Sequence, residues 1–181
     1  METTQRDQIP QHEHNYWNIG AENGAAFTRA TAAAAWQEYL DQHKQGNWMQ
    51  ALKIINRLAA FDPQQPEIWR VKARLHGVMG HAACCQTAIE TLLHLAPNDL
   101  DGLRMHALLL YCHQNFDKAL SICNSVLSKD PAQAEFWILK ADILKSSGKL
   151  QEAITACKRA LHIRPDNEAA QRLQYSLAFA A

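Results

Sequence analysis

The sequence predicts an all-α protein built from tandem helical hairpins, and two observations carry this prediction. Prolines recur at intervals of 34 residues, as Pro63, Pro97, Pro131 and Pro165. Turn-forming residues recur at the same interval, as Gly46, Gly80, Gln114 and Gly148. A fixed period of this length is typical of stacked helix–turn–helix units. The prolines therefore define four repeats, over residues 32–65, 66–99, 100–133 and 134–167.

Small residues fill position 20 of all four repeats and position 8 of the last three, where the paired helices must approach closely. Position 20 of the four repeats holds Ala51, Cys85, Ala119 and Ala153. Position 8 holds Tyr39, Ala73, Ala107 and Ala141. A glycine at position 15 ends the first helix in a left-handed turn, and the proline at position 32 ends the second helix. These positions predict two helices in every repeat.

The composition excludes several classes of partner and location. Lys and Arg total 18, as do Asp and Glu, so the formal net charge is zero and nucleic acid or an anionic membrane is disfavoured. No stretch approaches the roughly 20 apolar residues of a membrane span, and Met1–Gly20 lacks the apolar centre of a secretory signal. Five cysteines without a CxxC pair indicate reduced thiols. We expect a cytoplasmic protein, with a chain length suited to one domain.

The fourth repeat carries the family resemblance. Its signature residues are Trp137, Ala141, Leu144, Gly148, Ala153, Ala160 and Pro165. This spacing resembles the tetratricopeptide repeat (TPR) family, and the resemblance extends over residues 32–165. It implies a right-handed α-α superhelix, the TPR solenoid, with four hairpins. Gln114 at a turn and the cysteines Cys123 and Cys157 at position 24 depart from the family pattern.

The segments that flank the repeats are less regular. Residues 1–15 lack periodicity and are expected to be disordered. Residues 16–31 are expected to form a partly helical arm. Either this arm is frayed, or its Trp17 and Phe27 dock on the repeats or on a partner. Residues 168–181 are expected to form a capping helix. Its predicted packing face consists of Ala169, Ala170, Leu173 and Leu177.

The resemblance also implies a recognition surface, because the first helix of each TPR hairpin lines a concave groove. The residues that it places there are Trp36, Leu40, His43, Arg70, Arg74, Arg104, Met105, Leu108, Tyr111, Ile138, Asp142 and Lys145. Arginines among apolar groups suit a peptide or helix with apolar anchors and acidic residues. The alternative is that the arginines form ordinary surface ion pairs with Glu67, Asp101 and Glu135.

One family subtype is excluded by its residues. TPR proteins that bind C-terminal chaperone tails resemble one another in a clamp of Lys, Asn and Arg side chains. The corresponding positions here are Trp36, Leu40, Val71, Asp101 and Met105. If the comparison starts one repeat later, the clamp positions hold Arg70, Arg74, Met105, Glu135 and Leu139, and these residues do not match the clamp either.

No motif indicates catalysis, a metal or a cofactor. His81, Cys84 and Cys85 form the tightest cluster, but no second spaced pair completes a tetrahedral site. Glycine-rich phosphate loops, nucleophile elbows and HExxH motifs are missing from the sequence. We expect no catalytic residue, no metal site and no cofactor.

The sequence therefore predicts a non-enzymatic adaptor or scaffold for protein–protein interaction. A second hypothesis is a secretion chaperone similar to those of type III translocator proteins, which hold a client segment. RNA binding is disfavoured by the period of 34 and the neutral charge. A last alternative is self-assembly into a homo-oligomer, through the N-terminal arm or the apolar end Leu177–Ala181.

Overall fold

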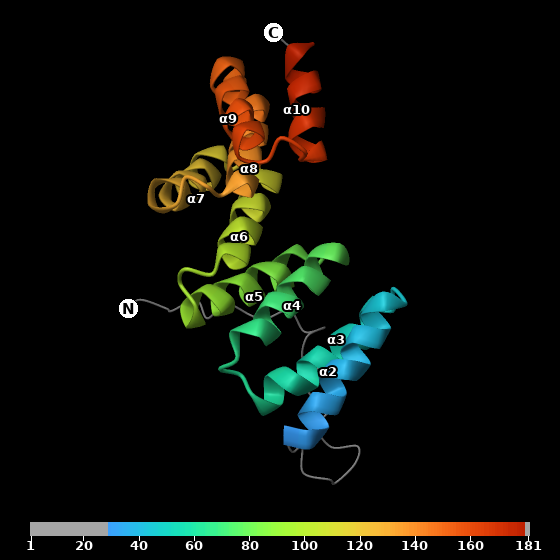
Figure 1. Ribbon diagram of the computed structural model, residues 1–181. Coiled ribbons are helices and arrows are strands. Elements are labelled where there is room, and N and C mark those ends of the chain that lie inside the picture. Colours follow the sequence, from blue (N-terminus) through green and yellow to red (C-terminus); the bar gives the residue numbers. More distant parts are fainter. Residues whose placement is uncertain (1–28, 180–181) are drawn as a thin grey trace, which may run out of the picture. The chain divides into compact units, whose positions relative to one another are not determined.

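The computed structural model describes residues 29–179, with side chains from residue 31. The predictions for residues 1–15, for Trp17 and Phe27 in the arm, and for the last two alanines lie outside the described residues. Within residues 29–179 every regular element is a helix (Figure 1). The predicted all-α class and the TPR resemblance are confirmed.

The chain divides into two compact units, with the boundary between Leu95 and Ala96. The first unit contains α2 (Arg29–Lys44), α3 (Trp48–Phe61), α4 (Pro66–Val78) and α5 (Ala82–Leu95). The second contains α6 (Leu100–Cys112), α7 (Phe116–Lys129), α8 (Ala134–Ser146), α9 (Leu150–Ile163) and α10 (Glu168–Ala178). This division differs from the single domain that chain length suggests. In tandem repeats each hairpin packs only on its neighbours, so the core need not be continuous.

The helices follow the 34-residue period. α4, α6, α8 and α10 begin at residues 66, 100, 134 and 168. The pairs α2 with α3, α4 with α5, α6 with α7, and α8 with α9 pack as hairpins. α10 packs against α9 and α8. It therefore occupies, within the second unit, the place that the first helix of a further repeat would take.

The residues at positions 8 and 20 are buried, as expected. Ala107, Ala119, Ala141 and Ala153 have no exposed surface. Cys123 and Cys157, at position 24, are also buried and fill apolar positions of the core. In the second unit these residues belong to two adjacent core clusters, one around α7 and one around α9. Small side chains therefore set the separation of the paired helices.

A left-handed residue ends the first helix of every hairpin. The backbone φ angles are +75° at Gly46, +73° at Gly80, +59° at Gln114 and +79° at Gly148. In the third hairpin the Asn115 N–H donates to the Leu110 carbonyl at 2.8 Å, and in the fourth the Lys149 N–H donates to the Leu144 carbonyl at 2.9 Å. These bonds satisfy carbonyls at the helix end. Gln114 thus adopts a conformation that favours glycine.

The proline carbonyls accept hydrogen bonds from the helix that follows. Trp69 Nε1 donates to the Pro63 carbonyl at 2.8 Å, and Trp137 Nε1 donates to the Pro131 carbonyl at 2.9 Å. In the last repeat Gln171 Nε2 donates to the Pro165 carbonyl at 2.8 Å. Six residues after Pro97 the chain has Leu103, which has no hydrogen-bond donor in its side chain, so the same bond cannot form there. The bond fixes the link between one repeat and the next.

The helix α10 covers the last hairpin. Its residues Ala170, Leu173 and Leu177 are buried in a cluster with residues of α8 and α9. Ala169 is exposed, although the sequence places it on the packing face. The adjacent Ala170 already occupies the contact, and successive residues of a helix point about 100° apart. The face that meets the core is therefore narrower than predicted.

Replacing Gln114 with glycine should stabilise the second unit. Glycine has no Cβ to oppose the left-handed conformation, and this gain exceeds the entropy that glycine loses on folding. We expect Gln114→Gly to raise the free energy of unfolding by about 0.5–1 kcal/mol, measured by urea denaturation.

Gly148→Gln is the matched control, because a Cβ added there meets no atom within 4 Å and the change chiefly tests the backbone conformation. This change should destabilise the unit by a similar amount. Equal midpoints for Gln114→Gly and the wild type would contradict the interpretation.

Candidate functional site

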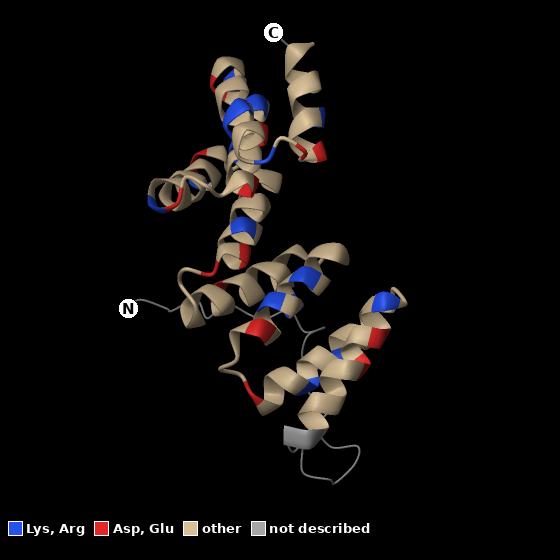
Figure 2. Ribbon diagram, in the orientation of Figure 1, with Lys and Arg blue, Asp and Glu red and all other residues tan. Residues whose placement is uncertain are grey.

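The residues predicted to recognise a partner all lie on the first helices of the hairpins. The first unit carries Trp36, Leu40 and His43 on α2, with Arg70 and Arg74 on α4. The second carries Arg104, Met105, Leu108 and Tyr111 on α6, with Ile138, Asp142 and Lys145 on α8. The two sets belong to different units, so each set is a candidate surface of its own. Acidic and basic residues are interspersed along the helices (Figure 2).

Aromatic rings line α2 in the first unit. The Trp36 and Tyr39 rings are 5.7 Å apart, edge to face, and the His43 ring lies 5.2 Å from that of Trp48. Trp36 is half-buried against the core, whereas Leu40 is 44% exposed. Burial raises the pKa of the Tyr39 hydroxyl, and the nearby Arg74 guanidinium partly opposes this shift. The surface therefore combines a guanidinium and an exposed leucine beside a buried, neutral phenol.

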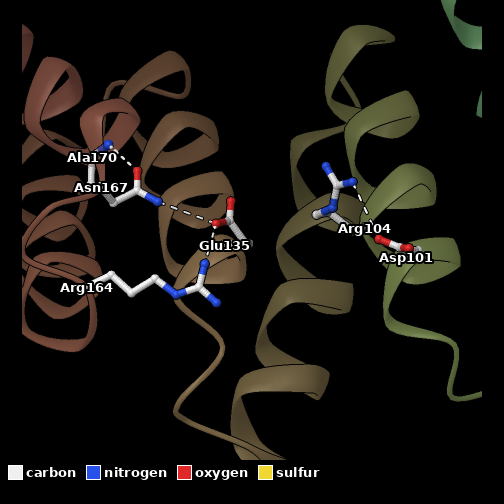
Figure 3. Close-up of polar contacts among 6 residues, drawn as sticks. All are labelled: Asp101, Arg104, Glu135, Arg164, Asn167 and Ala170. Atoms are coloured by element: carbon white, nitrogen blue, oxygen red, sulfur yellow. Dashed lines mark hydrogen bonds and ion pairs between the residues drawn. The ribbon is translucent and has the colours of Figure 1, made fainter. Parts of the chain in front are cut away.

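Arg70 and Arg104 each have an acidic neighbour about one turn away on the same helix. Arg70 forms an ion pair with Glu67. Arg104 lies 3.6 Å from Asp101, and both side chains are 40% exposed (Figure 3). That distance is longer than the about 2.7–2.9 Å of a strong charge-assisted hydrogen bond. Exposed pairs of this kind contribute little to stability, so Arg104 can exchange its partner at small cost.

Three of the predicted residues in the second unit also hold helices together. The Tyr111 and Ser146 hydroxyls are hydrogen-bonded at 2.9 Å, which joins α6 to α8. Lys145 Nζ donates to Ser176 Oγ at 3.0 Å, which joins α8 to α10. Ile138 is only 8% exposed and packs in the cluster beneath α10. Ile138 is therefore a core residue here, because the capping helix covers it.

The side chain of Asp142 is half-buried on α8. Burial raises the pKa of its carboxyl group, and the Lys145 ammonium opposes this shift. The Asp142 carboxylate in turn contributes to the raised pKa of the Cys157 thiol, after the larger effect of burial. This carboxylate is thus coupled to groups of its own unit.

Glu135 takes part in a cluster that the sequence did not reveal. Its Oε1 accepts from Arg164 Nη1 at 3.2 Å and from Asn167 Nδ2 at 3.4 Å (Figure 3). Asn167 Oδ1 also accepts from the Ala170 N–H at 3.0 Å and so caps α10. From the sequence, Glu135 was a candidate ion-pair partner for the arginines of the predicted recognition surface. Its partner is instead the arginine that precedes Pro165, which the sequence places about 30 residues away.

The thiols follow the packing of the helices. The Cys85 and Cys157 thiols donate to the carbonyls of Ala73 and Ala170, each at 3.3 Å. Burial raises the pKa of Cys123 to about 11. Among the described residues, no group of three His, Cys, Asp or Glu side chains is placed to share a metal ion. Nor does any described helix have the length and apolar character needed to cross a membrane.

The sequence matches proteins with tetratricopeptide repeats. A family model described as tetratricopeptide repeat matches residues 113–177. The chain is 30% identical over 105 residues to tetratricopeptide repeat protein 21A of Mus musculus, covering 57% of this chain and 8% of the relative. It is 26% identical over 130 residues to protein O-mannosyl-transferase TMTC1 of Mus musculus, covering 68% and 14% respectively. The chain thus spans a small part of either relative's length.

Solved structures share the fold at low identity. MamA from Desulfovibrio magneticus RS-1 matches with a TM-score of 0.72 and 17% identity, over 82% of this chain and 84% of that one. The first TPR domain of Spaghetti (RPAP3), bound to the HSP90 peptide SRMEEVD, matches with a TM-score of 0.59 and 18% identity. That match covers 66% of this chain and 94% of the other. At these identities the likeness concerns the fold alone.

Removing the cap of α10 should loosen the end of the second unit. We expect Asn167→Ala to lower the free energy of unfolding by about 1 kcal/mol, measured by urea denaturation. Asn115 precedes α7 without a side-chain capping bond, so Asn115→Ala is the matched control and should cost less. Equal losses in the two variants would contradict the assignment of the cap.

The thiols should react in the order of their exposure. The thiolate is the reactive form, so the buried Cys123 with its raised pKa should react with N-ethylmaleimide roughly a hundredfold more slowly than the exposed Cys112. Timed labelling followed by peptide mass spectrometry measures both rates. In urea the two rates should converge. Similar rates in the folded protein would contradict the burial of Cys123.

Proposed function

We propose that this tetratricopeptide-repeat protein is a non-enzymatic protein–protein interaction module that binds a peptide or helix on the exposed faces of its first helices. An adaptor or scaffold in the cytoplasm is the role that we infer. The partner carries apolar anchors and one or two acidic residues. The proposal concerns each of the two units separately.

The observation that carries the proposal is the pairing of Leu108 with Arg104 on α6. Leu108 is 42% exposed, and it follows Arg104 by about one helical turn. Covering the exposed part of this leucine would stabilise a complex by about 1 kcal/mol. Among residues 31–179, the Arg104 guanidinium is held only by Asp101, at 3.6 Å. A partner that buries the leucine and offers a carboxylate fits both side chains.

A similar combination occurs in the first unit. Leu40 on α2 is exposed, and the guanidinium of Arg74 lies near the Tyr39 hydroxyl beside it. The aromatic ring of Trp36 adds area that is rigid and half-buried. Aromatic and arginine side chains dominate the binding energy of many interfaces. The first unit therefore offers a second surface of the same chemistry.

The nature of the partner follows from the residues that replace the tail-binding clamp. Spaghetti binds an HSP90 peptide through its first TPR domain, which supports peptide binding as a use of this fold. Here the clamp positions hold Trp36, Leu40 and Asp101 instead of cations and amides. A carboxylate terminus would meet no matching set of donors. We therefore infer an internal peptide segment or a helix as the partner.

The absence of a catalytic constellation among the described residues supports a binding role. Burial raises the pKa of the Asp142 carboxyl group, and Lys145, the cation that opposes this shift, is already hydrogen-bonded to Ser176. The likeness to the transferase TMTC1 covers only 14% of that protein.

The proposal is tested by replacing two side chains of the second unit's candidate surface, those of Arg104 and Leu108. Partners captured by the wild-type chain are identified by mass spectrometry, and one of them is then titrated by calorimetry against Arg104→Ala with Leu108→Ala. We expect this double variant to bind at least about tenfold more weakly, because central arginine and apolar contacts carry most of an interface's binding energy. Both side chains are partly exposed, so the fold is preserved.

The matched control removes charge from the second helices. Lys118 on α7 and Lys158 on α9 are exposed, and Lys118→Ala with Lys158→Ala should leave binding unchanged. Arg70→Ala with Arg74→Ala tests the first unit in the same assay. If neither unit's variant binds more weakly than the lysine control, the proposed surface is wrong.

A further inference from the structure

A cavity of about 550 Å³ lies beside the second helices of the last two repeats. Its main lining residues are Leu127, Pro131, Trp137, Arg159, His162 and Ile163. All of them belong to the second unit, and none is among the residues predicted for the first-helix surface. The cavity is therefore distinct from the surface proposed above.

The floor of this cavity is apolar. Leu127 is buried, and the side chains of Trp137 and Ile163 are half-buried. The indole N–H of Trp137 already donates to the Pro131 carbonyl at 2.9 Å. The ring therefore presents only apolar surface to an occupant. A side chain that fills this floor must itself be apolar.

The rim of the cavity is cationic. Arg159 and His162 are exposed and stand three residues apart on α9, which places them on one face of the helix. Within residues 31–179 no carboxylate lies within 4.0 Å of the Arg159 guanidinium. The nearby loop contains Asp130, but its carboxylate accepts from the Ala132 N–H at 3.0 Å and from Gln133 at 2.6 Å. Among the described residues, the Arg159 guanidinium is therefore exposed to solvent and has no ion-pair partner.

We propose that this cavity binds a peptide segment of a partner protein in which an apolar side chain stands beside a carboxylate. The apolar side chain lies on the floor formed by Trp137 and Ile163, and the carboxylate pairs with Arg159. Ligand cavities in proteins commonly enclose about 300–1,000 Å³, so the volume accommodates such a segment. An arginine fork is well suited to a carboxylate because it donates two parallel hydrogen bonds.

The preceding repeat provides an internal comparison. The residues 34 positions earlier are Leu103, Ser125, Ser128 and Lys129, in place of a tryptophan, an arginine, a histidine and an isoleucine. Lys129 Nζ there donates to Asn98 Oδ1 at 3.2 Å. The third repeat therefore lacks the apolar indole and the guanidinium that the last repeat presents.

The proposal is tested on the full chain with a synthetic probe, acetyl-Gly-Leu-Asp-Leu-Gly-amide. Titration into ¹⁵N-labelled protein should shift the Trp137 indole resonance and the amides of α9 around Arg159. Arg159→Ala should weaken binding about fivefold, the change expected from losing one exposed ion pair. Replacing Asp by Asn in the probe should weaken binding to the same extent. Replacing both leucines by serine should abolish it.

Lys158→Ala is the matched control, because it removes a neighbouring exposed cation of α9 that does not line the cavity. It should bind the probe like the wild type. Equal affinities for Arg159→Ala and Lys158→Ala, shifts confined to the first-helix surface around Arg104 and Leu108, or no binding at millimolar probe would each overturn the proposal. Shifts around Arg104 and Leu108 that leave the Trp137 indole and α9 unchanged would instead support the first-helix surface, so the two proposals fail independently.

Discussion

The close approach of the two helices in each hairpin is the constraint on which the rest of the structure depends. In the third repeat Ala107 and Ala119 are completely buried, and in the fourth Ala141 and Ala153 are. A larger side chain at any of these positions would separate the helix axes and open the core. Dispersion contacts between closely packed helices then compensate for the ordering of a short repeat that could not fold alone.

The junctions between repeats convert this local packing into an array. A left-handed turn reverses the chain within a hairpin, and a proline followed six residues later by a hydrogen-bond donor directs it into the next one. Trp69 and Trp137 supply that donor, and Gln171 supplies it for the capping helix. Leu103 does not, and Asp99 instead caps α6 by accepting from the Gly102 N–H at 2.7 Å. The third repeat thus begins with a helix cap where its neighbours use an indole.

The same packing explains why some residues predicted for recognition are exposed to a partner and others are not. First-helix residues close to the capping helix make structural contacts. Ile138 packs in the core and Lys145 is hydrogen-bonded to Ser176. Residues farther from it, such as Leu108, remain exposed. At the other side of α8, the Trp137 indole that links two repeats also forms part of the floor of the cavity beside Arg159. Recognition surfaces on such a protein are therefore the parts of the repeat that packing leaves uncovered.

The sequence by itself determined the fold class, the positions of the hairpins and the close helix contacts at positions 8 and 20. These follow from local rules, because glycine and proline act on their own backbone and a 34-residue period places like residues alike. The Trp–Pro bond could also have been found, since the two residues recur six positions apart. Only the tertiary structure decided that Glu135 pairs with Arg164, and that Ile138 is covered by α10. Both depend on side chains about 30 or more residues apart, whose contact is set by how neighbouring helices pack and not by the periodicity of either helix.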